Sequence, residues 1–201
     1  MRTRFLLLLP LLAACNSQPE TTNPEGAGVA ADSTAAYDPD ASSDSLRMGK
    51  AGGVAVGGAA LTPDKALPDN LAASPELSQL LLALKQTELA GRLGGEGPYT
   101  VFAPSNAAFG GLPHGAMAGL LRPESKQNLT GLLGYHILPS RLLALDLRDG
   151  QELTTLEGQK LKIGVQGEVI TVNGARVTTP DVVSKNGIIH VIDKVLLPPS
   201  E

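Results

Sequence analysis

The stretch from Asn186 to Pro198 constrains the fold more than any other part of this sequence. It begins with Asn-Gly, a pair that tolerates positive φ and therefore marks a turn. The apolar run that follows is short, rich in β-branched residues and ended by Pro198, which favours a strand over a helix. Because alternate side chains point to opposite faces and both faces are mostly apolar, the pattern predicts a central strand covered on both sides.

Two polar residues interrupt this predicted strand. His190 lies on the face of Ile188 and Ile192, whereas Asp193 lies on the opposite face with Val191. Since buried polar groups are almost always hydrogen-bonded, His190 and Asp193 are both predicted to have partners inside the protein.

Three separated motifs resemble the hallmarks of the fasciclin domain, an extracellular module. The first, Tyr99 to Phe109, reads Tyr-Thr-Val-Phe-Ala-Pro-Ser-Asn-Ala-Ala-Phe. The second is Tyr135-His136 followed by Ile-Leu-Pro, and the third is Asn186 to Pro198. They occur in the family's order between about Leu67 and Pro199, so the sequence is identified as a member of the fasciclin-domain family.

This resemblance implies a compact β-sandwich or wedge flanked by a helical layer, with a role in adhesion. It suggests Tyr135 and His136 as interaction residues, and it assigns structural roles to Ser105, Asn106, His190 and Asp193. Two departures stand out. Ala107 replaces a residue that is commonly acidic, and Pro180 to Val183 matches only part of the segment that carries an integrin-binding motif in some animal relatives.

The amino terminus resembles a bacterial lipoprotein signal peptide, predicted to cover residues 1–14. Arg2 and Arg4 precede an apolar stretch that ends at Leu-Ala-Ala-Cys. That stretch is far shorter than the roughly 20 residues of a membrane-spanning helix. The pattern implies cleavage before Cys15 and lipidation of its thiol, which would anchor the chain in a membrane. The alternative is an ordinary secretory signal. Asn16, rather than Asp, follows the cysteine, as is usual in lipoproteins sent to the outer membrane. The domain is therefore expected at that membrane, facing either the periplasm or the cell surface.

Residues 15–66 are predicted to form the lipidated cysteine and a flexible linker. The segment from Asn16 to Ala66 is rich in Ala, Gly, Ser, Thr, Pro and Asp and has no sustained apolar period. A soft chain of this length has an end-to-end distance of about 40 Å. Val54 to Val56 could form a short strand, but the glycine pairs around it favour linker. The folded domain is then expected over residues 67–201.

Composition excludes some classes of function. The net charge of the whole chain is −4 at pH 7, so no basic field exists for nucleic acid. Trp is absent and aromatic residues are few, which removes the usual stacking platforms for a single strand or a sugar. With a single cysteine committed to lipid, no disulfide can stabilise the domain.

Helical signals dominate the first half of the domain. Ser74-Pro75 is typical of a helix start, and leucines follow at helical spacing as far as Leu84. A strand is predicted over Tyr99–Ala103, after which Ser105 caps a short helix. Further helices are predicted over Glu88–Leu93, Ala116–Leu121 and Pro123–Leu133.

Short β segments with glycine turns follow from Gln151 onward, which makes the domain α+β. Within them, residues 160–172 are predicted to form a hairpin that turns at Gln166-Gly167. In that register Leu161 faces Val172, Ile163 faces Ile170 and Lys162 faces Thr171, which keeps the lysines out of the core.

The histidines His114, His136 and His190 could be metal ligands. Their spacing carries no ligand signature, so the sequence favours structural roles in which His136 and His190 tie segments together. One specific hypothesis is that one of them bonds the Ser105-Asn106 turn. No cofactor or metal is expected.

A serine hydrolase is the enzyme to consider, because Ser105 follows a strand and opens a helix. The sequence there lacks the glycines of Gly-x-Ser-x-Gly, which favours a helix cap over a nucleophile. Glycine pairs near residues 52–58 lie outside any strand-to-helix unit, so they predict no phosphate loop.

The sequence therefore predicts a lipid-anchored envelope protein whose domain binds an unknown macromolecule: a protein, a matrix component or an envelope polymer. Catalysis is not expected. Exposed contact regions are predicted at Gly110–Gly115 and Pro139–Arg148. The alternatives are a small-ligand or metal-binding envelope protein and, less favoured, a Ser105-dependent hydrolase.

Overall fold

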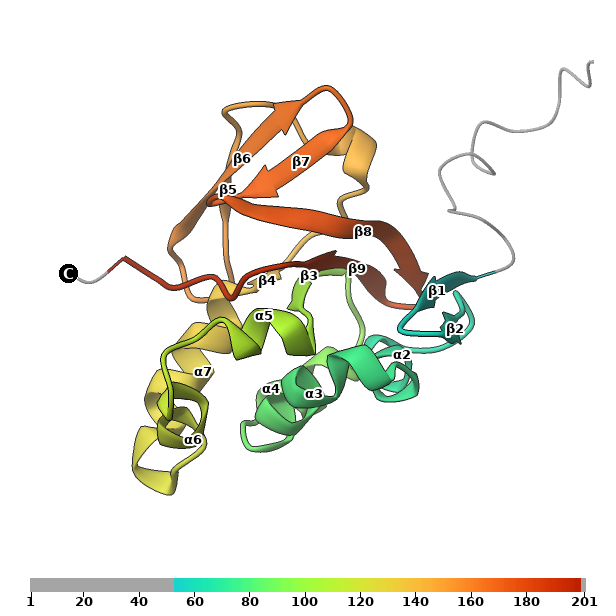
Figure 1. Ribbon diagram of the computed structural model, residues 1–201. Coiled ribbons are helices and arrows are strands. Elements are labelled where there is room, and N and C mark those ends of the chain that lie inside the picture. The colour runs from blue at the N-terminus through green and yellow to red at the C-terminus, as the bar shows by residue number, and fades with distance from the viewer. Residues whose placement is uncertain (1–52, 200–201) are drawn as a thin grey trace, which may run out of the picture. The chain divides into compact units, whose positions relative to one another are not determined.

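The computed structural model describes residues 53–199. The predicted signal peptide, Cys15 and most of the predicted linker lie outside these residues. A hairpin and a helical first half precede a β-rich second half (Figure 1). The elements are β1 Val54–Val56, β2 Ala59–Leu61, α2 Leu67–Ala73, η1 Pro75–Leu77, α3 Ser78–Lys85, α4 Leu89–Leu93, β3 Tyr99–Pro104, α5 Asn106–Gly110, α6 Ala116–Leu120, η2 Pro123–Ser125, α7 Lys126–Tyr135, β4 Ile137–Leu138, η3 Ala144–Asp146, β5 Glu152–Thr154, β6 Lys160–Gln166, β7 Val169–Val172, β8 Ala175–Ser184 and β9 Gly187–Ile192. This order confirms the α+β class.

Seven strands form one mixed sheet in the order β4-β3-β9-β8-β7-β6-β5. β3 and β9 run parallel, while the other neighbours in this sheet run antiparallel. β9 lies between β3 and β8, and all of its residues are buried. The prediction of a central strand covered on both faces is confirmed.

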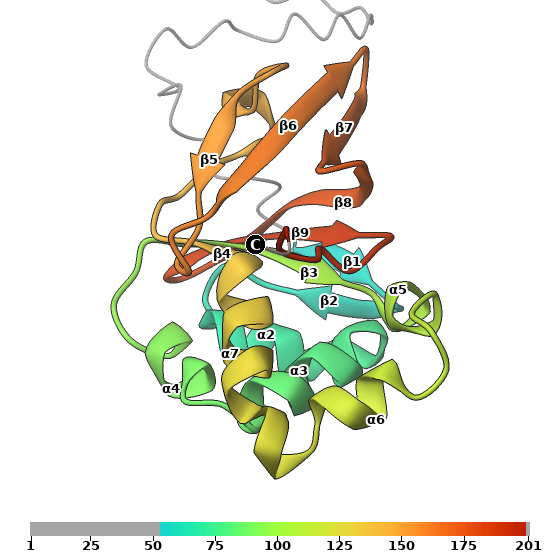
Figure 2. The same ribbon diagram turned by 90° about the vertical axis from the view of Figure 1, so that its left-hand side faces the viewer.

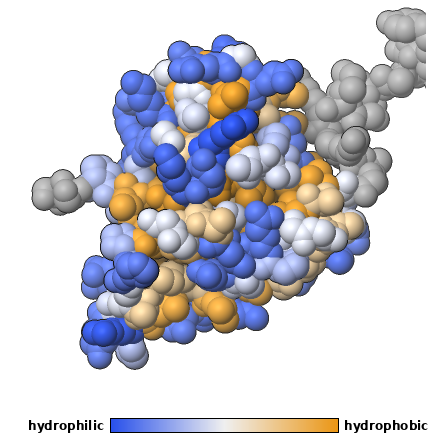
Figure 3. Space-filling view, viewed as in Figure 1, coloured by the Kyte–Doolittle hydropathy of each residue, from blue (hydrophilic) through white to orange (hydrophobic). Residues whose placement is uncertain are grey.

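An apolar core lies on each side of β3 and β9. Val101 and Ile189 pack in the core shared with the helices, whereas Phe102 and Ile192 pack in the core shared with β6 and β7. Figures 1 and 2 both show the helices below β3 and β9 and the strands β5, β6 and β7 above them. In Figure 3 apolar residues gather along the seam between these layers, and hydrophilic residues cover much of the upper strands. The arrangement is a β wedge on a helical layer.

The start of β9 lies very close to the start of β3. Tyr99 pairs with Gly187, and a Cβ at Gly187 would overlap the carbonyl oxygen of Tyr99. The Tyr99 N–H also donates to the carbonyl oxygen of Asn186 (3.2 Å). Glycine is therefore required at position 187 because only a residue without a side chain permits this approach.

The Asn186 side chain joins the same point to the helical layer. Its Oδ1 accepts from the Leu67 N–H at 2.9 Å, and its Nδ2 donates to the carbonyl oxygens of Leu93 (2.7 Å) and Gly95 (2.8 Å). The Asn-Gly pair thus fixes the entry to α2, the end of α4 and the start of the central strands together.

The prediction of a flexible linker is wrong for residues 53–66. They form the β1–β2 hairpin and the approach to α2, and Val56 and Leu61 are buried in the helical-side core. The turn consists of Gly57 and Gly58, with φ of 59° and 82°. Glycines that suggested flexibility instead supply the positive φ that a two-residue hairpin turn needs. The folded region therefore begins before Leu67.

Asn70 ties this hairpin to the sheet. The side chain is fully buried; Oδ1 accepts from the Thr62 N–H at 3.1 Å, and Nδ2 donates to the Thr62 carbonyl (2.8 Å) and to Ser184 Oγ (2.8 Å). Ser184 ends β8, so Asn70 links α2, the segment after β2 and the sheet.

The predicted helices are largely present, with two differences. Ser74 does not cap a helix; its hydroxyl donates to the Val56 carbonyl at 3.1 Å, and the segment behind it divides into η1 and α3. The additional helix α2 was missed because Pro68 and Asn70 interrupt its short apolar pattern.

The predicted β6–β7 hairpin is correct in its faces and wrong in its register. Ile163 pairs with Val172 and Val165 with Ile170, so the turn is Gly167-Glu168. Gly167 has φ of 60°, and it occupies the first turn position, where positive φ is required in a type II′ turn. Because the pairs shift by two residues, the side chains keep their faces.

We expect Asn70→Ala to lower the free energy of unfolding by about 2–3 kcal/mol, because it removes the hydrogen bonds of a fully buried amide and takes this partner from the Thr62 N–H and the buried Ser184 hydroxyl. Asn128→Ala, a change at an exposed residue, is the matched control. Urea denaturation of both variants tests this, and equal stability of the two would contradict the role given to Asn70.

Candidate functional site

The connection between β4 and β5 is the predicted contact region Pro139–Arg148, here called the η3 loop. It contains the η3 turn, and Leu145 at its tip is 67% exposed, the highest value among the large apolar side chains of residues 53–199 that are exposed. Loops on protein surfaces commonly carry binding residues. What distinguishes this loop is how firmly its backbone is held.

Thr100 of β3 holds the first part of the η3 loop. Its hydroxyl donates to the Ser140 carbonyl at 2.7 Å and accepts from the Leu142 N–H at 2.9 Å. Thr100 itself is fully buried, so the loop begins on a fixed point of the core.

His190 of β9 and Asp181 of β8 hold the middle of the η3 loop. His190 Nε2 lies 3.0 Å from the Leu142 carbonyl, and the Ala144 N–H donates to Asp181 Oδ1 at 2.7 Å. Asp181 has φ of 58°, which it adopts at an irregular part of β8 where the pairing with β9 shifts. The left-handed conformation is uncommon for a residue other than glycine, and here it belongs to the residue that holds the loop.

Apolar contacts complete the attachment of the η3 loop. Leu143 is buried with Val183 and Ile188, and Leu147 is buried in the core on the side of β6 and β7. Between these two anchors only Leu145 projects as an exposed apolar side chain. Leu145 therefore lies on a loop whose backbone would lose little conformational entropy on binding a partner.

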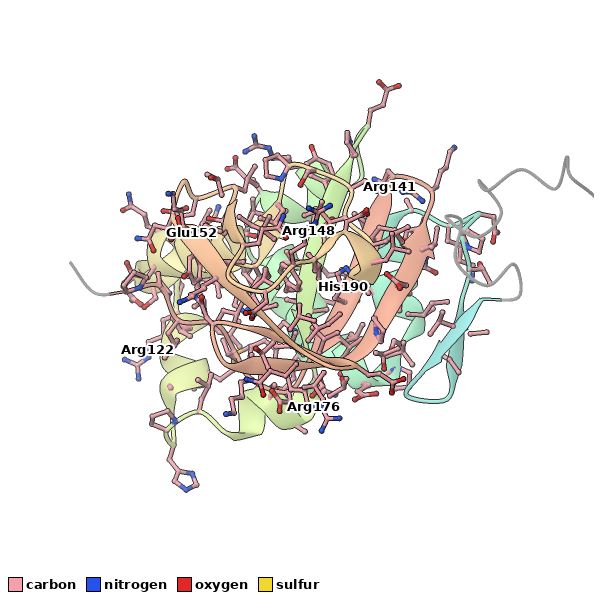
Figure 4. All side chains as sticks on the ribbon, turned by 90° about the horizontal axis from the view of Figure 1, so that it is seen from above. Arg122, Arg141, Arg148, Glu152, Arg176 and His190 are labelled. Carbon is pink, nitrogen blue, oxygen red and sulfur yellow. The ribbon has the colours of Figure 1, made fainter. Side chains whose placement is uncertain are left out.

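Two arginines flank the exposed leucine. Arg141 and Arg148 are exposed, and no carboxylate among residues 53–199 forms an ion pair with either. In Figure 4 Arg141 lies near the β8–β9 turn and Arg148 lies over the middle of the domain, with His190 in the interior. This loop combines an apolar tip with unpaired positive charge.

His190 is a structural residue with both ring nitrogens engaged. Because a carbonyl only accepts, Nε2 carries the proton that bonds Leu142, and Nδ1 accepts from the Asp181 N–H at 3.3 Å. The ring also stacks on Phe102 with 5.5 Å between centroids. Burial lowers the pKa of His190, while the Leu142 carbonyl and the negative charge of Asp181 oppose that shift.

His136 has the same structural role, and it joins α7 to the segment after β9. Its Nδ1 donates to the Leu132 carbonyl at 2.7 Å, and its Nε2 accepts from the Leu196 N–H at 3.0 Å. Burial lowers the pKa of His136 to about 4, and the bond to Leu132 opposes the shift. As predicted, both buried histidines join separate segments.

Tyr135 and His136 were expected to contact a partner, yet both side chains are buried. Tyr135 Oη donates to the Lys160 carbonyl at 3.0 Å and accepts from Asn173 Nδ2 at 2.7 Å. These residues connect α7 to the β wedge, so neither presents a surface to a macromolecule in this structure.

Of two further structural expectations, that for Asp193 is correct in its partner and wrong in its burial, and that for the Ser105-Asn106 turn is wrong. Asp193 is exposed just after β9 ends, and its Oδ1 accepts from the Arg176 N–H at 2.8 Å. The strand ends earlier than the apolar run suggested, which releases Asp193 to the surface. Neither buried histidine bonds the Ser105-Asn106 turn, because their nitrogens already serve other backbone groups.

The side chains of the Ser105-Asn106 turn have other hydrogen-bond partners. Ser105 Oγ accepts from the Ala108 N–H at 3.2 Å, so it caps α5 as predicted. Asn106 reaches the neighbouring helical segment: its Oδ1 accepts from the Gln79 N–H at 3.1 Å and its Nδ2 donates to the Pro75 carbonyl at 2.9 Å. No hydrogen bond joins Ser105 to a histidine within residues 53–199.

Among the described residues, no three His, Cys, Asp or Glu side chains come together as ligands for a metal ion. His114 is exposed, and the other two histidines are occupied by backbone groups. Residues 53–199 also contain no helix with the length and apolar character needed to cross a membrane.

Comparison with known families agrees with these features. Residues 75–198, from η1 to the end of the predicted C-terminal motif, match the family described as Fasciclin domain. The chain belongs to the fasciclin-domain family. Its helical layer, central parallel strand pair and two buried histidines thus belong to a fasciclin domain that a hairpin and α2 precede.

Relatives with this domain come from distant organisms. The chain is 43% identical over 128 residues to Protein sll1483 of Synechocystis, covering 64% of this chain and 71% of that protein. It is 37% identical over 135 residues to human Periostin, covering 67% of this chain but only 16% of Periostin. It is 34% identical over 132 residues to Immunogenic protein MPB70 of Mycobacterium bovis, covering 63% and 66%.

A solved structure confirms the fold. The chain superposes with a TM-score of 0.62 on a FAS1 domain pair from the insect cell adhesion molecule Fasciclin I, at 22% identity, covering 68% of this chain and 52% of that one. At this identity the likeness establishes the fasciclin fold alone.

We expect the fasciclin domain to lose stability in mild acid. The pKa of His136 falls from 6.5 in a free side chain to about 4 in the fold, so the unfolded chain binds the proton first. The stabilisation is present above about pH 6.5 and is lost as the pH falls toward 4, by up to ~3 kcal/mol. The lowered pKa of His190 acts in the same direction.

Urea denaturation between pH 7 and pH 5, where most carboxylates remain ionised, measures this loss. His114→Gln, at an exposed histidine, should keep the wild-type pH dependence, whereas His136→Gln should reduce it even if its stability at pH 7 is lower. A free energy of unfolding that is constant over this range would disprove the assignment.

Proposed function

We propose that this chain is a lipid-anchored protein of the bacterial cell envelope, at the outer membrane, whose fasciclin domain binds another macromolecule in adhesion or matrix contact without catalysing a reaction. The anchor rests on the lipoprotein-like sequence that ends at Cys15. Two or three acyl chains on that cysteine would make release from a membrane very slow.

The observation that supports a binding role is the fixed backbone of the η3 loop, which exposes Leu145. Fixing a loop in advance lowers the entropy lost on association, so an exposed side chain on such a loop binds more favourably than one on a free loop. Leu145 is presented in this way between Arg141 and Arg148. Arginine is among the residues that most often contribute binding energy at interfaces.

The described geometry favours binding over hydrolysis. A serine nucleophile needs an adjacent base, and Ser105 Oγ instead accepts a backbone N–H at the start of α5. Both buried histidines use each ring nitrogen for a backbone group, which leaves neither available as a base in this conformation.

We expect the purified protein to bind intact cells, matrix or an envelope polymer fraction saturably, and Leu145→Asp to weaken that binding by about tenfold or more because it places a charge at the apolar tip. Leu82→Asp is the matched control, since Leu82 is also exposed, at 57%, but lies on α3. Binding isotherms against each fraction measure both variants.

The binding proposal fails if wild-type protein binds none of these fractions while it turns over an ester substrate in a reaction that Ser105→Ala abolishes. Equal losses in the Leu145 and Leu82 variants would instead show that the η3 loop is not the contact surface.

We expect Cys15→Ala to abolish lipidation and to move the protein from the membrane fraction to the soluble fraction. Ser17→Ala, which leaves the cysteine intact, should remain with the membrane. Fractionation with mass analysis of the amino terminus tests both variants, and full membrane retention of the Cys15 variant would refute the anchor.

A further inference from the structure

A pocket opens beside the β8–β9 turn, at the foot of the η3 loop. Its volume is about 540 Å³, and it is lined by the segment 94–98 together with Ala66, Arg141, Lys185 and Asn186. This size falls within the range of small-ligand sites. We refer to it as the Arg141 pocket.

Two cations at the Arg141 pocket lack acidic partners. The one salt bridge among residues 53–199 joins Lys160 to Glu152, so Arg141 and Lys185 form no ion pair within that region. Glu96 also lines the pocket and is likewise unpaired there. The lining therefore carries two positive charges and one negative charge, and an anion with a single charge balances it.

The backbone adds unused donors. Within residues 53–199 the N–H groups of Glu96 and Gly97 donate no hydrogen bond, although their neighbours Gly95 and Tyr99 donate to Arg92 and Asn186. Consecutive free N–H groups near cations are a recurring way in which proteins receive carboxylates.

The pocket is also fixed in shape. Asn186 Nδ2 holds the Gly95 carbonyl at 2.8 Å, and the Lys185 N–H donates to the Lys65 carbonyl at 2.8 Å. A Cβ at Gly97 would overlap the Asn186 carbonyl oxygen, so the segment 94–98 lies directly against the turn that carries Lys185. A ligand would meet a site that is already formed.

We infer that the Arg141 pocket binds a carboxylate of a partner protein, either an Asp or Glu side chain or a chain end, with Arg141 and Lys185 as its counter-charges. Glu96 disfavours a doubly charged phosphate. The lining contains no aromatic side chain on which a sugar ring could stack, which favours a peptide over an acidic polysaccharide. This inference rests on the proposed binding function and adds the chemistry of the partner.

The test uses the full-length protein and three fluorescent peptides measured by anisotropy at low salt. The first alternates aspartate and glycine and has blocked ends; the second has asparagine in place of aspartate; the third is the asparagine peptide with a free terminal carboxylate. We expect the first or third peptide to bind and the fully neutral one to bind at least about tenfold more weakly. Which of the two binds distinguishes a side chain from a chain end.

Variants locate the binding. Arg141→Gln/Lys185→Gln should weaken it by about tenfold or more. Glu96→Gln should strengthen it by about threefold, because a repelling charge is removed. The control Arg122→Gln/Lys194→Gln removes two other exposed cations, and Figure 4 places Arg122 far from Arg141. It should bind like wild type.

Equal binding of charged and neutral peptides, equal loss in both double variants, or stronger competition by inorganic phosphate or a polyuronate than by acetate would overturn the inference. Its failure is distinct from failure of the binding function. If the Arg141 pocket is wrong, Lys185→Gln, which leaves the η3 loop intact, still binds the cell or matrix fraction as wild type does. If only the wider function is wrong, the peptide result stands although wild type binds no fraction.

Discussion

The parallel pairing of β3 with β9 is the interaction on which the rest of this structure depends. It joins Tyr99–Pro104 to Gly187–Ile192, so the helical first half and the β-rich second half meet along one line. Such distant pairing carries a large loop-closure entropy before any contact compensates it. Both apolar cores form against this pair, and of the two residues that hold the η3 loop from it, Thr100 lies on β3 and His190 on β9.

Two neutral imidazoles serve as connectors between these parts. Each uses one nitrogen as donor and the other as acceptor, so each joins two backbone segments that no helix or strand ladder would bring together. Histidine suits this task because its two nitrogens lie on opposite sides of a rigid ring and can take opposite roles. The same arrangement leaves no ring nitrogen of His136 or His190 free for metal binding or proton transfer, so both histidines have structural roles.

Much of the fold could be predicted from the sequence because its signals are local. The β-branched run after Asn186 specified a buried strand, and Ser105 capped its helix as expected. The failures involve partners distant in sequence. Nothing local to Gly57 tells whether a glycine pair lies in a linker or in a turn, since that depends on the core that receives Val56. Likewise the η3 loop was predicted to be exposed, but its attachment to Asp181 and His190 arises only when β8 and β9 fold beside it.

The position of the β1–β2 hairpin has a mechanical consequence. A force applied at Gly53 acts on one end of a hairpin whose other strand leads directly into α2, with Val54 opposite Leu61. Load in that direction separates the pairs in succession, and it also acts on the Ser74 hydrogen bond to the Val56 carbonyl and on Val56 in the helical-side core. A force at Gly53 is therefore resisted by the apolar core as well as by the strand pairing, because the hairpin cannot open without exposing Val56.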